Sequence, residues 1–318
     1  MPVPGDDEVL IRVGACGVSH KDVLERNGIY RRDMSFPIVI GFEIAGQVIA
    51  AGSQVTELKP GDRVCSKAFA SCGQCRYCRS GRETTCRRRK PVRGGYAEYA
   101  ALPQDALVRI PSDMPFEIAC ALGPGAGVAL NAVRDVARVS LTDTVLVTGA
   151  TGGVGLPSVQ LAARAGARVI ALTRSKSKSE HLTHAGAAEV VVIPPDGDFS
   201  GAVRALTDGD GVDVVIDTVG SRVFAAAFDS LALHGRYALV GQLYNEEVKI
   251  NPARIFFKRA VLAGVGSVSR AQLEDVIRLV GNGHLRPIVD RVMPLAEIAE
   301  AHRIVEKSAV FGRVVIKP

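Results

Sequence analysis

Residues 144–155 read TVLVTGATGGVG, an apolar run that ends in a cluster of glycines. The run predicts a buried strand, and LPSVQLAARAG at 156–166 predicts the helix that follows it. Glycines permit a tight turn and let backbone N–H groups approach a pyrophosphate, while the helix N-terminus adds a partial positive charge. We therefore predict a dinucleotide-binding turn made of Gly149, Gly152, Gly153, Val154 and Gly155.

The same strand–helix texture continues on both sides of this turn. Between residues 142 and 264 we count six Val/Ile/Leu-rich strands that alternate with helices, one of them predicted over VFAAAFDSLALHG at 223–235. Such alternation indicates a parallel sheet covered on both faces, that is, an α/β Rossmann domain with a doubly wound sheet. Gly220 and Gly241 end the strands DVVIDTVG and RYALVG, and we expect both glycines to border the cofactor groove.

The end of the second strand bears on the choice of cofactor. ARVIALTRSKSK at 167–178 has Thr173 and Arg174 where an acidic residue would hold the ribose hydroxyl of NAD(H). Arg174, with Ser175 and Lys178, is suited to a 2′-phosphate, because a guanidinium binds phosphate bidentately. We therefore predict NADPH. The alternative is that Arg174 and Lys178 only line a solvated helix start.

A different sequence pattern precedes the glycine turn. Residues 8–110 consist of short apolar runs punctuated by glycine and proline, which predicts a rolled β domain. Residues 115–139 are helical in pattern, and the closing GRVVIKP predicts a strand that returns to the first domain. We place the first domain at 1–124, the nucleotide-binding domain at 125–266 and the C-terminal return at 267–318.

Four of the seven cysteines fall in a C-x2-C-x2-C-x7-C pattern within SCGQCRYCRSGRETTC, residues 71–86. Four thiolates on one short loop suit a tetrahedral zinc ion, and a zinc ion closed by four protein ligands is structural. The predicted ligands, in a lobe of about residues 65–90, are Cys72, Cys75, Cys78 and Cys86. The remaining Cys16, Cys65 and Cys120 are expected to be free thiols, which favours a reducing cytoplasm.

The charge of the chain is mildly basic, with 39 Lys and Arg against 33 Asp and Glu. This excess is too small to indicate nucleic-acid binding. One run, Arg87 to Lys90 with Arg93, is more basic; it predicts a solvated loop, with an anionic ligand or partner as the alternative. No run of 18 apolar residues predicts a membrane span, and MPVPGDDEV does not resemble a secretory signal.

Together these segments resemble the medium-chain dehydrogenase/reductase superfamily, which includes zinc alcohol dehydrogenases and zeta-crystallin-like quinone reductases. The resemblance covers essentially the whole chain and implies a GroES-like first domain, a Rossmann domain and a structural zinc. It rests on ACGVSHKDV, FPIVIGFEIAGQV, PGDRV, the cysteine pattern, GGYAEYA, VLVTGATGGVG, DVVIDTVG and FGRVVIKP.

The chain departs from that family at the catalytic zinc. The three ligand positions align with Ser19, Phe42 and the neighbourhood of Pro124, and phenylalanine and proline cannot bind metal. Without zinc, oxidation of a simple alcohol lacks its Lewis acid. Conjugate reduction needs only hydrogen-bond donors near the carbonyl oxygen. The resemblance therefore implies an NADPH-dependent reduction, without catalytic zinc, of an enone, an enoyl thioester or a quinone.

The resemblance also suggests roles for individual residues. Ser19, Lys21 and Tyr30 are the catalytic candidates, and His20 matches a position that contacts the cofactor pyrophosphate. Lys21 has a solvated side chain as its alternative, and Tyr30 a packing role. Histidines on the later predicted helices, His181, His184 and His302, are expected at the surface.

Two other functions stay open: a catalytically weak NADPH-binding protein, and a zinc alcohol dehydrogenase with a rebuilt site. The expected partners are a small carbonyl substrate and other copies of the chain, with neither nucleic acid nor membrane. The apolar strand AVLAGVG at 260–266 is expected at a sheet edge, where pairing would form a homodimer or homotetramer.

Overall fold

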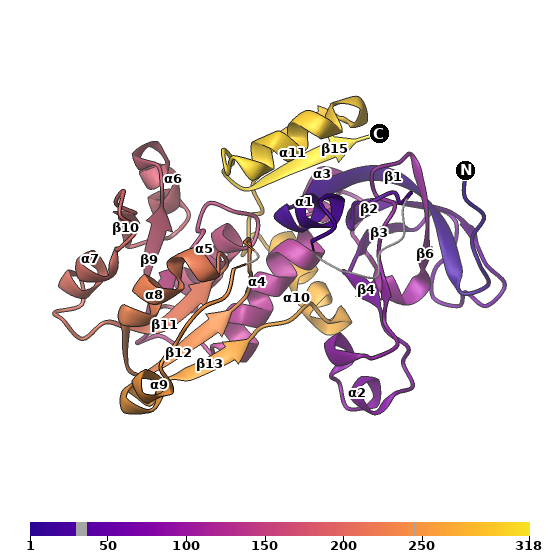
Figure 1. Cartoon of the computed structure of the whole chain (residues 1–318). Helices are drawn as coiled ribbons and strands as arrows, with labels where there is room; N and C mark the ends of the chain where they lie inside the picture. Colours follow the sequence, from indigo (N-terminus) through magenta and orange to yellow (C-terminus); the bar gives the residue numbers. More distant parts are fainter. Residues whose placement is uncertain (30–36, 245) are drawn as a thin grey trace. The chain divides into compact units, whose positions relative to one another are not determined.

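The computed structural model describes residues 1–29, 37–244 and 246–318. The chain forms two compact units (Figure 1). The first comprises Met1–Gly127 with Ser267–Pro318, and the second comprises Val128–Gly266. The fold is mixed α/β, with a β-sheet domain as the first unit and a doubly wound parallel-sheet domain as the second, as predicted.

The first unit is built on a seven-stranded sheet of order β14-β15-β1-β2-β3-β7, with β6 paired to β1. Strand β15 pairs antiparallel with β1, so the C-terminal strand does return to the first domain, as predicted. The buried faces of these strands form one apolar core, which includes Ile11, Ile44 and Leu107. The strands are β1 (Glu8–Val18), β2 (Glu43–Ala51), β3 (Arg63–Ser66), β6 (Tyr99–Pro103), β7 (Leu107–Arg109), β14 (Val289–Pro294) and β15 (Arg313–Lys317).

A two-stranded ribbon, β4 (Phe69–Ala70) with β5 (Lys90–Pro91), carries the residues between its strands away from this sheet. We call residues 71–89 the cysteine lobe. Within it, Cys86 alone is buried, so the lobe has no apolar core of its own. The helices of the first unit are α1 (His20–Arg26), α2 (Arg76–Arg79), α3 (Phe116–Ala119), α10 (Arg270–Gly281) and α11 (Ile298–Glu306).

The second unit contains a six-stranded parallel sheet of order β10-β9-β8-β11-β12-β13. The order reverses after β8, as in doubly wound dinucleotide-binding domains. Its strands are β8 (Thr144–Val147), β9 (Arg168–Thr173), β10 (Glu189–Val192), β11 (Val212–Asp217), β12 (Leu231–Leu239) and β13 (Val261–Gly264). Its helices are α4 (Val128–Leu130), α5 (Gly155–Arg164), α6 (Ser179–His184), α7 (Ser200–Ala205), α8 (Ser221–Asp229) and α9 (Pro252–Lys258).

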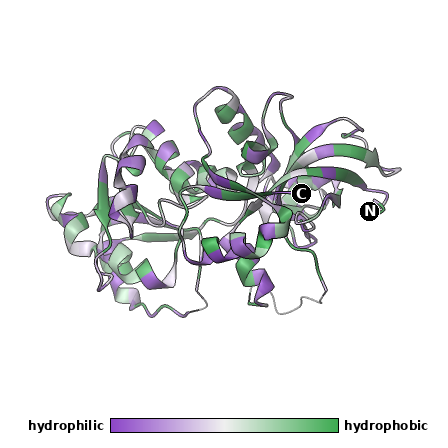
Figure 2. Ribbon diagram, turned by 90° about the horizontal axis from the view of Figure 1, so that it is seen from above, coloured by the Kyte–Doolittle hydropathy of each residue, from purple (hydrophilic) through white to green (hydrophobic). Residues whose placement is uncertain are grey.

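Amphipathic helices cover this sheet, and in Figure 2 hydrophobic and hydrophilic residues alternate along the helix ribbons. Helix α8, for example, buries Phe224 and Phe228 in the core that also contains Tyr237. The helix predicted over residues 223–235 is wrong beyond Asp229, because β12 already begins at Leu231. The apolar pattern does not mark that change, since LAL suits a buried helix and a buried strand equally.

Strand β13 lies at one edge of the six-stranded sheet, as predicted, and its Val261 is 55% exposed. Pairing of two copies through this edge stays a prediction. One helical stretch, Phe116–Val136, is long and apolar enough to cross a membrane, but most of it is buried inside the protein. Such burial is what a core helix requires.

Candidate functional site

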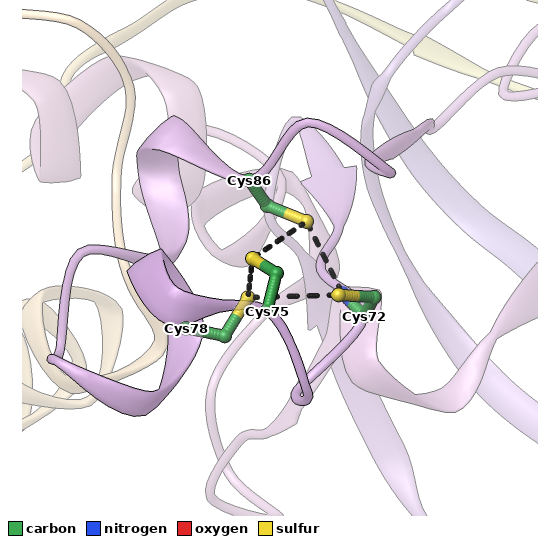
Figure 3. A group of neighbouring side chains, drawn as sticks. All are labelled: Cys72, Cys75, Cys78 and Cys86. Carbon is green, nitrogen blue, oxygen red and sulfur yellow. Dashed lines mark hydrogen bonds between the residues drawn. The ribbon is translucent and has the colours of Figure 1, made fainter.

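The four predicted metal ligands converge in the cysteine lobe (Figure 3). The Sγ atom of Cys75 lies 3.5 Å from that of Cys78 and 4.0 Å from that of Cys86, and the Sγ atoms of Cys72 and Cys78 are 4.0 Å apart. With Zn–S bonds of about 2.3 Å, the edge of a ZnS4 tetrahedron is about 3.8 Å. The cluster therefore fits a closed, structural zinc. Among the described residues it is the only group of three or more His, Cys, Asp or Glu ligands this close together.

Local chain geometry brings these thiols together. Gly73 and Gly81 take left-handed backbone conformations, with φ of 66° and 73°, at turns of the loop. Hydrogen bonds from the backbone N–H groups of Gln74 and Cys75 lower the pKa of Cys72 to about 6. Burial, and then the neighbouring thiols, raise the pKa of Cys78. The lobe thus favours a thiolate at Cys72, which is the form that binds metal.

A buried lysine anchors the lobe to the first unit. Lys67 is fully buried, and its Nζ lies 3.1 Å from Glu83 Oε1 and 3.2 Å from Asp105 Oδ2. Asp105 also accepts a hydrogen bond from the Ser71 hydroxyl, directly before Cys72. Glu83 lies inside the loop, before Cys86. The ammonium of Lys67 therefore binds the loop directly through Glu83 and indirectly through Asp105, which binds Ser71 at the start of the loop.

The predicted catalytic segment opens helix α1. Ser19 is its N-cap residue, and the Ser19 hydroxyl donates a hydrogen bond of 2.7 Å to Asp22. Lys21 Nζ lies 2.9 Å from the buried carboxylate of Glu25 and 3.7 Å from the centre of the Phe42 ring. The ammonium of Lys21 is therefore held by an ion pair with Glu25 and a cation–π contact with Phe42.

His20 is the first residue of α1 and is half-buried. Tyr30 lies outside the described residues. His302 is a correction: it was expected at the surface, but its side chain is buried, with Nδ1 3.2 Å from Arg26 Nη1 and its ring edge-on to Tyr96. Its helix, α11, packs on α1, and a helix periodicity alone does not show which face another helix covers.

A second buried contact between ionisable side chains lies beside this segment. Glu43 Oε2 is 2.9 Å from Arg313 Nε, and Glu43 is 1% exposed. A Cβ atom at Gly17 would lie 2.4 Å from the same oxygen, so the glycine makes room for the carboxylate. Burial raises the pKa of Glu43 from 4.5 to about 7, although Arg313 and Lys21 lower it and Asp22 raises it further.

This shift predicts a pH dependence of stability. Between pH 4.5 and about 7 the folded protein holds a proton on Glu43 that the unfolded chain has lost. The contribution of Glu43 to stability is therefore lost as the pH rises through this window, by at most about 1.4 kcal/mol per pH unit. We expect the variant Glu43→Gln, which cannot ionise, to show a flatter dependence of its free energy of unfolding on pH, measured with urea. The exposed Glu247→Gln should keep the wild-type slope; an unchanged slope in Glu43→Gln would contradict the assignment.

The positions aligned with the family's catalytic zinc ligands hold side chains that pack. Phe42 is 4% exposed, and Pro124 is buried in the π-helical turn Leu122–Gly127. The cysteines nearest these positions in sequence, Cys16 and Cys120, are buried, and burial raises the pKa of both thiols.

The glycine turn of the second unit follows β8 and leads into α5. Gly149 has φ of 56°, and its carbonyl accepts a hydrogen bond from the Gly152 N–H. A Cβ atom at Gly155 would lie 2.1 Å from the Gly149 oxygen, so this turn closes only with glycine. The turn, which also includes Gly153 and Val154, exposes backbone N–H groups at the start of the ten-residue helix α5. Such a backbone surface fits a pyrophosphate.

The carboxyl ends of the neighbouring strands are joined by Asp217, a residue that the sequence analysis did not single out. This buried carboxylate accepts hydrogen bonds from the Thr148 hydroxyl at 2.6 Å and the Tyr237 hydroxyl at 2.8 Å. It also accepts the Gly220 N–H. Gly220 has φ of 91°, and a Cβ atom at Gly241 would lie 2.6 Å from the backbone oxygen of residue 218. Both glycines thus lie at the carboxyl ends of the parallel strands, the same end of the sheet at which the glycine turn begins.

The predicted phosphate-binding residues follow β9, at the same carboxyl end of the sheet. Thr173 is buried, and its hydroxyl accepts a hydrogen bond from the Ser175 N–H. Arg174 is exposed, and Ser175 and Lys178 are half-buried. No carboxylate of the described residues forms an ion pair with Arg174, so its guanidinium is available to an anion.

Comparison with known proteins identifies the family. Residues 5–112 match the family model of the alcohol dehydrogenase GroES-like domain, and residues 153–282 match that of the zinc-binding dehydrogenases. The acryloyl-coenzyme A reductase of Sulfurisphaera tokodaii is 31% identical over 100% of this chain and 94% of its own length. The quinone oxidoreductase of Mus musculus is 30% identical over 99% of this chain and 91% of its own.

Solved structures agree with these relatives. The crystal structure of AibC is 41% identical, covers 100% of this chain and 90% of its own, and superposes with a TM-score of 0.92. A mycobacterial protein, Rv1454c, complexed with NADPH, is 30% identical over 100% of this chain and 93% of its own, with a TM-score of 0.86. The chain therefore belongs to the medium-chain dehydrogenase/reductase superfamily of oxidoreductases.

Proposed function

We propose that the protein is an NADPH-dependent reductase that adds hydride to the activated C=C bond of an enone or enoyl thioester, or to a quinone, without a catalytic zinc ion. One feature carries the proposal: the resemblance aligns Ser19, Phe42 and Pro124 with the family's metal-ligand positions, and the ammonium of Lys21 lies 3.7 Å from the centre of the Phe42 ring. The relatives named acryloyl-coenzyme A reductase and quinone oxidoreductase support the substrate class.

The choice of NADPH over NADH rests on the loop after β9. Arg174 is exposed and has no carboxylate partner among the described residues, and no acidic residue stands there to repel a 2′-phosphate. The similarity to a protein complexed with NADPH supports this choice. We place the pyrophosphate against the turn Gly149–Gly155, with Gly220 and Gly241 of the same unit as further cofactor contacts.

When bound, NADPH supplies the hydride. The chain must then stabilise the negative charge that develops on the carbonyl oxygen and provide a proton. Lys21 is a fixed positive charge, because Glu25 and Phe42 hold its ammonium. Ser19 is a hydroxyl donor whose partner, Asp22, has a pKa raised by burial. A carboxyl with a raised pKa can return a proton to Ser19, so the pair suits proton transfer. Tyr30 remains a third catalytic candidate.

The metal in this proposal is a single structural zinc ion in the cysteine lobe, held by Cys72, Cys75, Cys78 and Cys86. Its four protein ligands leave no open position for substrate. Metal analysis should therefore find close to one zinc ion per chain, whereas close to two would support an alcohol dehydrogenase with a rebuilt catalytic site.

Turnover tests the proposal directly. We expect purified protein to oxidise NADPH with acryloyl-coenzyme A, a simple enone or benzoquinone, and to show no alcohol oxidation with NADP+. Lys21→Met, which keeps the length of the side chain and removes its charge, should lower kcat by about tenfold or more. Lys59→Met, at a surface position, is the matched control. Binding of NADPH without turnover of any substrate would instead favour a catalytically weak NADPH-binding protein.

A further inference from the structure

The cysteine lobe carries an unusual concentration of arginine side chains. Residues 71–89 contain six arginines and one acidic residue, Glu83, whereas the rest of the chain has 33 basic and 32 acidic residues. All six arginines are exposed. With zinc bound, the four thiolates and the Zn2+ ion together add a charge of −2, so the lobe keeps a net charge of +3. This charge comes from the side chains of Arg76, Arg79, Arg82, Arg87, Arg88 and Arg89.

No carboxylate neutralises these six side chains. Among the described residues, none of them is within ion-pair distance of an acidic group, and Glu83 is already bound to Lys67 and to the Arg270 N–H. Elsewhere in the chain many exposed arginines do pair, as Arg168 does with Glu189 and Arg222 with Glu246. The lack of carboxylate partners among the described residues leaves these guanidinium groups accessible to an external anion.

Several of these guanidinium groups are nevertheless held in place. Arg76 and Arg87 lie 4.6 and 5.8 Å from the centre of the Tyr77 ring, and Arg89 lies 5.4 Å from that of Phe69. Arg88 Nη2 is 3.3 Å from Cys72 Sγ. Contacts to aromatic rings restrict the side chains without neutralising them, so less conformational entropy is lost when a ligand binds. The thiolate of Cys72, in contrast, offsets part of the charge of Arg88.

We propose that this arginine cluster binds the phosphate groups of a coenzyme A thioester substrate. The inference rests on the proposed function and narrows it to enoyl-coenzyme A thioesters. Coenzyme A presents a 3′-phosphate and a diphosphate, and guanidinium groups bind phosphate oxygens through paired, charge-assisted hydrogen bonds. A flexible pantetheine arm separates those phosphates from the thioester, so the phosphates can bind at a site apart from the reacting carbons.

The test compares substrates that differ only in the phosphate-bearing end. Kinetics with acryloyl-coenzyme A and acryloyl-pantetheine are measured for wild type and for Arg79→Gln/Arg82→Gln/Arg87→Gln, which spares the arginine that contacts Cys72. Arg12→Gln/Arg164→Gln/Arg204→Gln removes three exposed arginines elsewhere and is the matched control. Zinc content and Tm should be unchanged in both variants.

We expect the lobe variant to raise KM for acryloyl-coenzyme A by about tenfold or more, with kcat unchanged and KM for acryloyl-pantetheine unaffected. In wild type, KM for the coenzyme A substrate should also rise with salt. Direct titration of the protein with free ligand needs no turnover. Coenzyme A should bind the lobe variant more weakly than wild type, and dephospho-coenzyme A should bind wild type more weakly than coenzyme A does.

The phosphate site would be wrong if wild type had equal KM values for acryloyl-coenzyme A and acryloyl-pantetheine, or if only the control variant lost affinity for coenzyme A. Either result would leave the reductase proposal unaffected. Binding of inorganic pyrophosphate or ATP as tightly as coenzyme A would overturn it as well, by assigning the cluster to phosphates in general. If coenzyme A bound wild type more tightly than the lobe variant but no thioester were reduced, the phosphate site would be supported and the reductase proposal would be wrong.

Discussion

Replacement of Cys86 by serine, or removal of zinc with a chelator, is expected to unfold the cysteine lobe while the six-stranded sheet stays folded. The lobe has no apolar core, and its regular structure is limited to a four-residue helix and a short 3-10 turn. Its stability must therefore come from the metal and from Lys67. Zinc binding to small Cys-rich motifs contributes on the order of 10 kcal/mol, which such a lobe cannot replace.

Hydrogen exchange is the direct measurement. In the metal-free protein, amides of residues 71–89 should exchange fully, whereas those of β8 and β11 should stay protected. Unfolding of the lobe also separates Glu83 from Lys67, which leaves a buried ammonium with one carboxylate fewer. We therefore expect Tm to fall by roughly 10 °C.

Cys120→Ala is the control, because this cysteine is buried but lies outside the cluster. It should retain one zinc ion and a protected lobe. Retention of full lobe protection in Cys86→Ser would show that Lys67 and the ribbon hold the lobe without metal, and would contradict the structural role assigned to zinc.

Alanine at Arg174 is expected to weaken NADPH binding by roughly 10- to 100-fold and to change NADH binding by less than about threefold. The expected loss corresponds to charge-assisted hydrogen bonds to the 2′-phosphate, which contribute about 1.5–3 kcal/mol. NADH lacks that phosphate, so Arg174 makes no such bond to it. Lys178→Ala should act in the same direction with a smaller effect, because an ammonium binds phosphate as a point charge.

Fluorescence titration of both cofactors with each variant measures this selectivity. Arg164→Ala removes an exposed arginine from α5 in the same unit and should leave both affinities unchanged. Equal losses for NADPH and NADH in Arg174→Ala would assign the residue to the shared part of the two cofactors, and the phosphate assignment would then be wrong.

Local patterns identified most elements that carry these predictions. The strand–glycine–helix run at 144–155 predicted the β8–α5 turn, because a buried parallel strand is apolar throughout and the turn accepts only glycine at Gly155. The cysteine spacing predicted the metal cluster for a similar reason, since its ligands lie within 15 residues of one another. The start of β12 at Leu231 was missed, because a continuous apolar run has no periodicity to separate helix from strand.

The sequence by itself determined the two-domain α/β fold, the thiol cluster and the glycine turn, because each depends on residues close together in the chain. Only the tertiary structure showed that Lys21 lies over Phe42, that Glu43 pairs with Arg313, that His302 is buried against Arg26, and that the lobe arginines lack acidic partners. These features depend on which distant side chains meet and on how much water remains around them. Burial and long-range pairing set charge and pKa, and neither follows from the order of residues along the chain.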